Sequence, residues 1–549
     1  MGIRKHSRVF ASAIALLGAI AMSFTALPAN AATSTPTYGN INPAQQGSII
    51  IHKHEYQNGT SATANPDGTG EDKLKTATIA NVQFTVYVIN GLDLSKSGSW
   101  AGLDKAVAPS SVTADTKVTV NGSDYSLKQV AQVTTDGNGL ATAAKLPVAA
   151  YVVVETQAPA NIVDMAAPFI VTIPFPDNAS SKGWLYDVNV YPKNAQTSIN
   201  KQVLSPTSFG LGSTTQYQVT SKVPTIGSDQ NFKYFIIDDV FDSRMTNPAV
   251  DAVSMVTYMT DAQGNQVIDT TKTSAVDAKY YKVTTSGQQV DVSFNKAGLA
   301  WLKTQPGADI MVSFSAKVNG IGNGTIPNTA KLYTDAEVSP NPPDTPPTVP
   351  PTNPPYTPPT SPTVYQYWGD ALIRKYDAND TSGNKSNDKK AGLSGAEFQV
   401  YNISGEKHPD SKSCNDTSIT GDPITVNGQS SFTSDANGVV NISGLFVNDS
   451  VGGDKSDTVR CYVLKETKAP AGYILPSGNG ALTPLTVKAG QTTITNGAGY
   501  DQYVGNTKQN GPNLPLTGST GIAVMVIVGV ALLGGAGALL AKRRFTTSR

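Results

Sequence analysis

Short runs rich in the β-branched and aromatic residues Val, Ile, Thr and Tyr recur along most of the chain, separated by segments rich in Gly, Pro, Asn and Asp. Residues 48–53, 81–88 and 151–155 are examples of these runs. Runs of this length and composition predict β-strands, and the segments between them predict turns. With 49 glycines and 35 prolines in 549 residues, the chain favours turn-rich β structure over helices. The hydrophobic pattern therefore predicts an all-β protein.

One series of strand and turn patterns occurs twice. Residues 151–160 read YVVVETQAPA, and residues 462–471 read YVLKETKAPA. A turn, DGNG at 136–139 and DANG at 435–438, precedes each copy. Such a repeat predicts two domains of one fold. Residues 195–337 lack the repeat but remain strand-like, so the sequence predicts three β-sandwich domains in a row.

Changes in composition set the boundaries between the predicted segments. Residues 340–362 are mostly Pro, Thr and Asn, which favours an extended conformation and predicts a semi-rigid spacer. In chain order, the predicted segments are an export signal (1–31), a first domain (32–194), a middle domain (195–339), the spacer (340–362), a last domain (363–508) and a C-terminal segment (509–549).

The two ends of the chain carry hydrophobic runs of a different kind. Arg4, Lys5 and Arg8 precede an apolar run, and residues 29–31 read Ala-Asn-Ala. This order predicts a cleavable export signal, and therefore an extracellular mature protein. Near the C-terminus, the uncharged run 521–541 is long enough to cross a bilayer as a helix, and the basic tail after it predicts a cytoplasmic end.

Charge and cysteine content narrow the partners and the compartment. The 41 basic and 41 acidic side chains give a formal net charge of zero, so no nucleic-acid partner is predicted. The chain has two cysteines, Cys414 and Cys461, and in an oxidising compartment they predict one disulfide. The four histidines show no zinc or catalytic-triad spacing, so we predict no metal site, no cofactor and no enzyme activity on other molecules.

A pentapeptide stands before the C-terminal apolar run, and it consists of Leu514, Pro515, Leu516, Thr517 and Gly518. On composition alone, this end of the chain is a membrane anchor. The pentapeptide, the apolar run and the basic tail in this order resemble the cell-wall sorting signal of Gram-positive surface proteins. The resemblance implies that a sortase cuts between Thr517 and Gly518 and passes the Thr517 carboxyl to an amine. The membrane helix then belongs only to the precursor.

Strand alternation predicts a buried polar group in the last domain. Lys375, Glu466 and Asn506 each share a strand face with apolar neighbours. Their burial predicts either a hydrogen-bonded ion pair or a Lys375–Asn506 isopeptide bond, formed by attack of a neutral amine while a protonated Glu466 relays protons. Residues 462–473 resemble the E-box of the isopeptide-linked Ig-like domains of Gram-positive pilins, Tyr-x-x-x-Glu-Thr-x-Ala-Pro-x-Gly-Tyr, without a mismatch. The resemblance implies the covalent bond.

The middle domain carries an analogous set of residues. Lys201, Asp238 and Asn328 each alternate with apolar neighbours on one strand face. The set is similar to the second isopeptide subtype of these domains, which implies a Lys201–Asn328 bond with Asp238 as its catalyst. Asp239 and Asp242 are nearby alternatives, and alternation predicts Asp239 on the opposite face.

The first domain offers Lys53, Glu155 and Asn194, which match the residues of the last domain one for one. The match implies a Lys53–Asn194 bond with Glu155 as its catalyst. The first domain departs from the E-box after residue 160, where Asn-Ile replaces Gly-Tyr, and in this family the N-terminal domain is one whose bond is sometimes absent or late. His52 and His54 flank Lys53 on the opposite face, and we predict that they are surface residues.

Residues 184–194 read WLYDVNVYPKN, which is similar to the pilin motif Trp-x-x-x-Val-x-Val-Tyr-Pro-Lys-Asn. In shaft pilins the Lys of this motif accepts the sorted Thr of the next subunit, which implies the same role for Lys193. Alternation gives an independent argument, because it places Lys193 and Asn194 on opposite faces, so that Lys193 can be exposed beside a buried Asn194. The alternative is an ordinary solvated lysine at a strand end.

Together these motifs resemble the major shaft subunit of sortase-assembled fimbriae, of the kind found in Actinomyces and corynebacteria. The resemblance implies three Ig-like domains of CnaB-like, CnaA-like and CnaB-like type. It implies that a class C sortase joins Thr517 to Lys193 of the next identical subunit, and that a housekeeping sortase attaches the polymer to peptidoglycan. A tip pilin and a host or bacterial receptor are further expected partners. The alternative is a monomeric wall-anchored adhesin that uses Thr517 but not Lys193.

Overall fold

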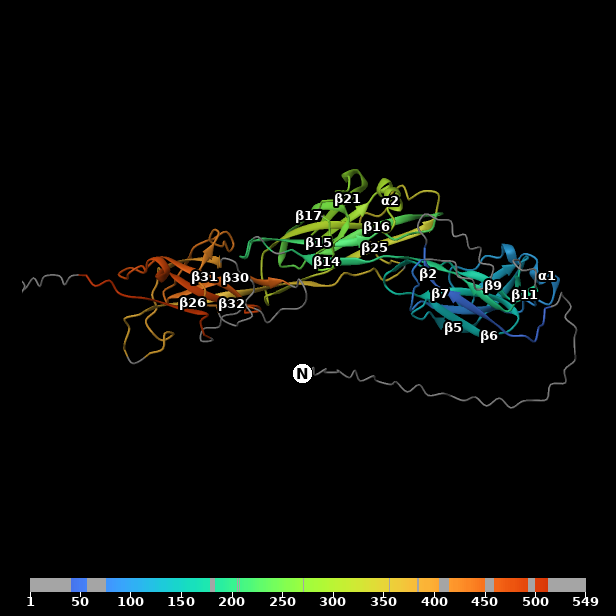
Figure 1. The fold of residues 1–549 in the computed structure, drawn as a ribbon, viewed down its shortest axis with the longest axis horizontal. Helices are drawn as coiled ribbons and strands as arrows, with labels where there is room; N and C mark the ends of the chain where they lie inside the picture. Colours follow the sequence, from blue (N-terminus) through green and yellow to red (C-terminus); the bar gives the residue numbers. More distant parts are fainter. Residues whose placement is uncertain are drawn as a thin grey trace, which may run out of the picture.

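The computed structural model describes residues 41–56, 76–177 and 183–511, except residues 205, 207, 270, 355, 383–384, 404–413, 450–458 and 492–498. The predicted export signal, the sorting pentapeptide and the C-terminal apolar run lie outside the described residues. None of the helices in the described ranges has the length and apolar character of a membrane span. Three β-rich domains follow one another along the long axis of the molecule (Figure 1), which confirms the predicted all-β architecture.

The first domain packs a five-stranded sheet of order β4-β5-β3-β7-β9 against smaller sheets of order β12-β1-β6 and β2-β13-β8. Alternate apolar residues of β1, β3 and β7, such as Ile49, Phe84 and Tyr151, fill the space between the sheets. The described elements of this domain are β1 (Gly47–His52), β2 (His54–Glu55), β3 (Gln83–Ile89), α1 (Ser97–Trp100), β4 (Lys117–Val120), β5 (Ser123–Thr134), β6 (Leu140–Leu146), β7 (Ala149–Gln157), β8 (Ile162–Asp164), β9 (Phe169–Ile173), β10 (Phe175–Asp177), β11 (Gly183–Leu185), β12 (Asp187–Val190) and β13 (Lys193–Gln196).

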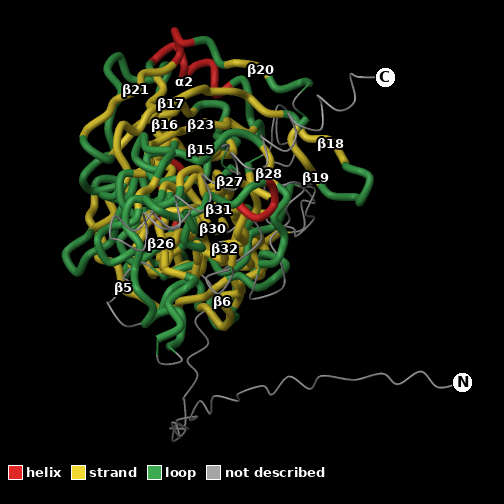
Figure 2. The backbone as a smooth tube through the Cα atoms, turned by 90° about the vertical axis from the view of Figure 1, so that its left-hand side faces the viewer, coloured by secondary structure: helices red, strands yellow, loops and turns green. Residues whose placement is uncertain are grey.

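The middle domain is a sandwich of two sheets, with orders β14-β15-β23-β17-β20 and β21-β22-β16-β25. Strand β16 is buried on both faces, and a hairpin of β18 and β19 projects from the side of the molecule (Figure 2). The described elements are β14 (Ile199–Val203), β15 (Thr214–Lys222), β16 (Gln230–Val240), β17 (Met245–Val256), β18 (Tyr258–Thr260), β19 (Gln266–Ile268), β20 (Ser274–Ala275), β21 (Tyr281–Ser286), β22 (Gln289–Phe294), α2 (Lys296–Lys303), β23 (Asp309–Val318), β24 (Thr325–Asn328) and β25 (Ala330–Val338).

The last domain is a second two-sheet sandwich. One sheet has the order β24-β26-β30 with β33 also paired to β26, and the other has the order β28-β27-β31-β32 with β29 paired to β27. The described strands are β26 (Val364–Asp377), β27 (Glu397–Ile403), β28 (Ile419–Thr420), β29 (Phe432–Thr433), β30 (Val439–Asp449), β31 (Val459–Lys468), β32 (Leu482–Lys488) and β33 (Gln502–Asn506).

The middle and last domains share strand β26. Its first residues pair with β24, where Val364 lies opposite Asn328, and the rest of the strand pairs with β30 and β33. A single apolar cluster runs through both domains, from Phe314 to Trp368 and Leu464, whereas the first domain has apolar clusters of its own. The middle and last domains therefore form one packed unit.

The Pro-rich segment 340–362 does not separate the two domains as the predicted spacer would. It turns back and runs along β25, where the Leu332 N–H donates to the Pro359 carbonyl at 2.9 Å. The Thr334 N–H donates to the Tyr356 hydroxyl, also at 2.9 Å. Proline lacks an N–H, so the segment accepts these hydrogen bonds through a carbonyl and a side chain, while the Ser361 N–H donates to the Ala330 carbonyl at 2.9 Å. We call this segment the strap.

Candidate functional site

Three polar residues meet inside the last domain: Lys375 in β26, Glu466 in β31 and Asn506 in β33. The Lys375 Nζ donates to Glu466 Oε2 at 2.8 Å and also to Asn506 Oδ1. The Asn506 Nδ2 donates to Glu466 Oε1 at 2.8 Å. All three residues are buried, with at most 3% of Glu466 exposed. Because β26 and β33 pair in parallel, a bond between Lys375 and Asn506 would join the two ends of the domain.

The surroundings of Lys375 favour a neutral amine. Burial lowers the pKa of Lys375, and the hydrogen bond and charge of Glu466 oppose this shift. The Phe398 ring centre lies 5.4 Å from the Lys375 Nζ, so an apolar ring replaces water on that side. An amine of lowered pKa held against a carboxamide, with a carboxyl hydrogen-bonded to both, has the groups needed for acyl transfer from Asn506 to Lys375.

The first domain repeats this arrangement. Lys53 lies between β1 and β2, and its Nζ donates to Glu155 Oε2 at 2.8 Å and also to Asn194 Oδ1. The Asn194 Nδ2 donates to Glu155 Oε1 at 2.6 Å. Burial lowers the pKa of Lys53 to about 8, against the opposing charge of Glu155. The first domain therefore brings together all three of its predicted residues, although it departs from the E-box.

The middle domain pairs Lys201 with Asp239, and the prediction that Asp238 faces Lys201 is wrong. The Lys201 Nζ donates to Asp239 Oδ2, and both side chains are fully buried. Asp238 lies on the other face of β16, opposite Asp291 of β22, and accepts a hydrogen bond from Gln289 Nε2 at 3.1 Å.

The error has a physical cause in the burial of β16. Every residue from 234 to 239 is buried, so the apolar pattern does not reveal which face of the strand lines the sandwich core. The core-facing residues are Phe235, Ile237 and Phe241, which share their face with Asp239. Asp242, the other alternative, forms an ion pair with Arg244 at 2.7 Å.

Asn328, the predicted partner of Lys201, is buried at the end of β24 with 2% of its surface exposed. Its amide interacts with Asp239, but neither amide atom makes a hydrogen bond of ordinary geometry within the described part of the chain. An unsatisfied buried carboxamide costs about 1–3 kcal/mol. Burial lowers the pKa of Lys201, as it does for the other two buried lysines.

Lys193 begins β13 and is only partly buried, whereas the neighbouring Asn194 is fully buried. Burial lowers the pKa of Lys193. An apolar groove of about 300 Å³ is lined by residues of β9 and β12 together with Phe175, Tyr191 and Pro192. Lys193 is therefore a partly exposed amine that directly follows a residue of this groove.

The two histidines beside Lys53 behave differently. His54 is 3% exposed, and its Nδ1 lies 3.0 Å from the Thr76 carbonyl oxygen, so the prediction that it is a surface residue is wrong. Residues 76–78 lie against β2 and pair with His54 and Glu55, which alternation within one strand cannot reveal. His52 is partly exposed, and its ring stacks on Tyr191 at 4.7 Å between ring centres.

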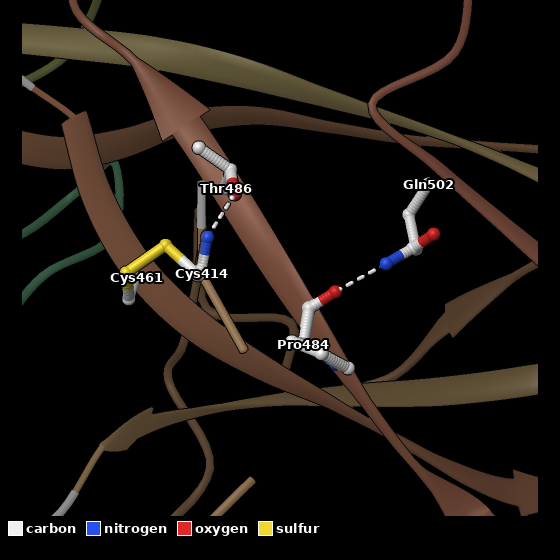
Figure 3. Close-up of a disulfide and its surroundings, with 5 residues drawn as sticks. All are labelled: Cys414, Cys461, Pro484, Thr486 and Gln502. Carbon is white, nitrogen blue, oxygen red and sulfur yellow. Dashed lines mark hydrogen bonds between the residues drawn. A yellow bond between two sulfur atoms is a disulfide. The ribbon is translucent and has the colours of Figure 1, made fainter. Parts of the chain in front are cut away.

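The predicted disulfide is confirmed. Cys414 and Cys461 are bonded, with their Cα atoms 5.4 Å apart, beside strand β32 (Figure 3). The Cys414 N–H donates to Thr486 Oγ1 at 3.1 Å, and further along the same strand Gln502 Nε2 donates to the Pro484 carbonyl at 2.5 Å. The disulfide and the Cys414 hydrogen bond attach Cys414 to the second sheet of the last domain, whereas the Gln502 hydrogen bond joins β33 to β32.

Sequence reasoning missed a carboxyl beside the first-domain site. Asp164 ends β8, and its Oδ2 accepts a hydrogen bond from Gln230 Nε2 of the middle domain at 2.7 Å. Burial raises the pKa of Asp164 to about 6. The repeat contained a signal for this residue. Alignment of its two copies places Asp164 opposite Leu475, so the first domain has a carboxyl where the last domain has an apolar side chain.

Comparison with known proteins assigns families to three parts of the chain. Residues 44–195 match the N-terminal domain family described as Gram-positive pilin subunit D1, and residues 379–498 match a prealbumin-like fold domain. Residues 506–544 match the LPXTG cell wall anchor motif.

Whole-chain relatives extend the comparison. The chain is 37% identical over 541 residues to fimbrial subunit type 2 of Actinomyces naeslundii, covering 95% of this chain and 94% of that one. It is 29% identical over 533 residues to fimbrial subunit type 1 of Actinomyces viscosus, covering 94% of each. The solved structure of the full-length major pilin SpaD from Corynebacterium diphtheriae covers 86% of this chain and 99% of its own, with a TM-score of 0.60 and 26% identity.

Tandem β-sandwiches with a wall-anchor motif define a surface protein attached to the cell wall. More specifically, this chain belongs to the family of Gram-positive fimbrial subunits, and it is a shaft pilin of the sortase-assembled type. Members of this family are structural subunits of a covalent, wall-anchored fimbria and not enzymes.

Proposed function

We propose that a pilus-specific class C sortase joins Thr517 of one subunit to Lys193 of the next, and that a housekeeping sortase then links the polymer, with a tip pilin at its far end, to peptidoglycan. The observation that carries this proposal is the setting of Lys193. Lys193 is partly exposed and directly follows Pro192, which lines an apolar groove, while Asn194 beside it is buried in the domain. The pilin motif thus exposes the Lys193 amine and buries the Asn194 carboxamide.

The chemistry requires a neutral amine. The sortase cysteine forms a thioester with the Thr517 carbonyl and releases the segment that begins at Gly518. The Lys193 Nζ then attacks the thioester carbon, a C–N bond forms, the C–S bond breaks and the sortase thiolate leaves. Partial burial lowers the pKa of Lys193, which increases the neutral fraction of its amine at a given pH.

The groove beside Lys193 suits the apolar end of the acyl donor. Its lining includes Phe169, Phe175 and Val190, which can bury the side chains of Leu514 and Leu516. The chain that follows β33, from Asn506 to Thr517, reaches about 36 Å when fully extended. The last domain of one subunit can therefore stay outside the groove while its tail enters it.

We also propose internal isopeptide bonds, in which each buried lysine displaces ammonia from its asparagine. The Lys Nζ–Asn Cγ bond forms, the Asn Cγ–Nδ2 bond breaks, and a carboxyl carries a proton from the amine to the departing nitrogen. The proposed bonds and their carboxyls are Lys53–Asn194 with Glu155, Lys201–Asn328 with Asp239 and Lys375–Asn506 with Glu466. The orphaned amide of Asn328 supports this chemistry, because acylation of Lys201 replaces an unsatisfied carboxamide.

Substitution of the pilin-motif lysine tests the polymerisation. We expect Lys193→Ala to abolish the high-molecular-weight ladder of wall extracts on denaturing gels, while the anchored monomer remains. Lys128→Ala is the matched control, because Lys128 is an exposed lysine on β5 of the same domain and should leave the ladder intact. A ladder that persists in Lys193→Ala would contradict the assignment of Lys193. A natural chain without any ladder would instead support the monomeric adhesin.

A further inference from the structure

One wall of the groove near the pilin-motif lysine belongs to an edge strand. β12 lies at the edge of the sheet β12-β1-β6, and β9 lies at the edge of the five-stranded sheet of the same domain. Residues of both strands line the groove of about 300 Å³. Among the described strands, β12 pairs with β1 alone, so side chains of β1 are placed to support β12 from the side away from β9.

Strand register brings a histidine of β1 next to the pilin motif. β1 pairs in parallel with β12, and the same register continues where β2 pairs with β13, so that His54 lies opposite Lys193. This register places His52 beside Tyr191. Alternation directs the side chains of Tyr191 and Lys193 to the same face of the strand. His52 therefore lies on the face that also presents the acceptor lysine.

His52 contacts two residues that line the groove. Its ring stacks on the Tyr191 ring, with 4.7 Å between the ring centres and 25° between the planes. Its Nε2 lies 2.8 Å from Asn189 Oδ1, and the ring nitrogen donates this hydrogen bond because an amide oxygen only accepts. Tyr191 and Asn189 both belong to the groove lining. The stack and the hydrogen bond thus fix the orientation of two lining side chains.

The sorting peptide of another subunit can reach this wall. The described chain ends at residue 511, so the pentapeptide 514–518 belongs to the segment outside the described residues. In the joining reaction proposed above, the Thr517 carbonyl carbon bonds to Lys193 Nζ. Leu516 directly precedes Thr517, and consecutive Cα atoms are about 3.8 Å apart. Leu516 must therefore lie close to Lys193, and Tyr191 is a groove residue two positions before that lysine.

We propose that His52 is a positioning residue of the acceptor site, and that it holds Tyr191 and Asn189 in the wall against which Leu516 of the incoming subunit packs. The inference rests on the joining reaction proposed above. Without His52, Tyr191 loses a stacking partner and Asn189 loses one hydrogen bond, so the wall must become ordered when the peptide binds, and this ordering weakens binding. His52 takes no part in the exchange of bonds at the sortase thioester, so its loss should change KM rather than kcat.

Kinetics of the joining reaction test this role. The acceptor is the full chain with Thr517→Ala, which can supply only an amine, and a synthetic peptide of residues 512–518 supplies the acyl group to purified class C sortase. We expect His52→Ala to raise the KM of the acceptor about threefold to tenfold, with kcat nearly unchanged, because a stacked ring pair is lost. Tyr280→Ala is the matched control, because Tyr280 stacks on Trp301 at 5.3 Å in the middle domain and its loss should leave KM unchanged.

A second donor peptide separates positioning from damage to the fold. In a peptide with Leu516→Ala, the side chain that packs on the wall is absent, so His52→Ala should raise KM by less than about twofold. Each comparison uses two acceptors with one peptide, so the preference of the sortase for either peptide cancels. A damaged first domain would raise KM by the same factor with both peptides. His52→Gln keeps a hydrogen-bond donor for Asn189 and serves where His52→Ala does not fold, and its KM should rise with the same dependence on Leu516.

Two results would overturn the inference. One is an equal KM for the acceptors with and without His52 in the reaction with the Leu516 peptide, and the other is a rise in KM by the same factor with both peptides. Tandem mass spectrometry of the acceptor that retains His52 locates the joined lysine. An acceptor that gains no peptide at Lys193 would overturn the proposed joining reaction itself, and this result is distinct from an unchanged KM.

Discussion

At the scale of single residues, each of the buried lysines is paired with one carboxyl inside an apolar domain. The side chains are 0% and 0% exposed for Lys53–Glu155, and 0% and 2% exposed for Lys375–Glu466. Transfer of two charges from water to such a site costs several kcal/mol per ion, and aromatic rings near the amines replace water only in part. Formation of an amide removes the lysine charge. If the internal bonds proposed above form, these ion pairs are the starting state of a reaction that relieves this cost.

The pairing in the middle domain leads to a prediction that separates two adjacent aspartates. We expect Asp239→Asn to prevent the Lys201–Asn328 bond, because Asp239 holds the Lys201 amine and interacts with Asn328. Asp238→Asn is the matched control and should leave the bond intact, because Asp238 lies on the other face of β16. Intact-mass spectrometry measures the result, since the Asp239 variant should retain one additional ammonia. Retention of that ammonia in the Asp238 variant would contradict the assignment.

The predictability of these residues depended on how many faces of each strand are buried. Alternation placed Lys201 correctly because β14 alternates between buried and exposed residues. It failed for Asp238 because β16 is buried on both faces, and then the apolar pattern carries no information about direction. The contact of Asp164 could not be predicted from its own sequence context, because the residue that binds it, Gln230, comes from another domain.

At the scale of elements, the strap and β26 connect the middle and last domains. The Pro-rich composition of the strap predicted an extended conformation, but composition says nothing about the surface on which an extended segment lies. In the structure the strap covers β25, and β26 continues from a pairing with β24 into the last domain. The segment that was expected to be a spacer is therefore packed against β25 as part of the middle domain.

A single hydroxyl tests whether the strap stabilises β25. Thr334 is fully buried, and its N–H donates to the Tyr356 hydroxyl. Tyr356→Phe should leave that N–H unsatisfied and weaken local protection by about 1–3 kcal/mol, which hydrogen exchange measured by mass spectrometry on β25 peptides would detect as faster exchange. Tyr258→Phe is the control, because Tyr258 is 40% exposed on the projecting hairpin. Unchanged exchange in Tyr356→Phe would show that the strap does not stabilise β25.

At the scale of the whole molecule, the chain is a row of domains, and the two interfaces between neighbouring domains differ in their contacts. The middle and last domains share a strand and an apolar cluster, whereas the first domain has separate clusters and meets the middle domain through polar contacts such as Gln230–Asp164. Lys193 begins β13, and β14 of the middle domain follows a few residues later, so tension applied at Lys193 and at the end of β33 passes through the middle and last domains. The row of domains was predictable from the repeat. The difference between the two domain interfaces was not, because it depends on contacts between residues of different domains.

Load bearing provides the last prediction, at Lys375 and Asn506. They are 131 positions apart along the chain, and a covalent link across a loop of that size removes about 5 kcal/mol of unfolded-state entropy by the loop-closure relation. The bond should also change the mechanical response of the domain. Because β26 and β33 are its first and last strands, a bond between them carries tension without loading the other strands.

Single-molecule force measurements test this bond. The natural chain should show no unfolding extension from its last domain, and Lys375→Met should add one. Lys468→Met, at a lysine of β31 whose side chain is 64% exposed, should behave like the natural chain. Equal extension in all three chains would rule out a load-bearing bond at this site.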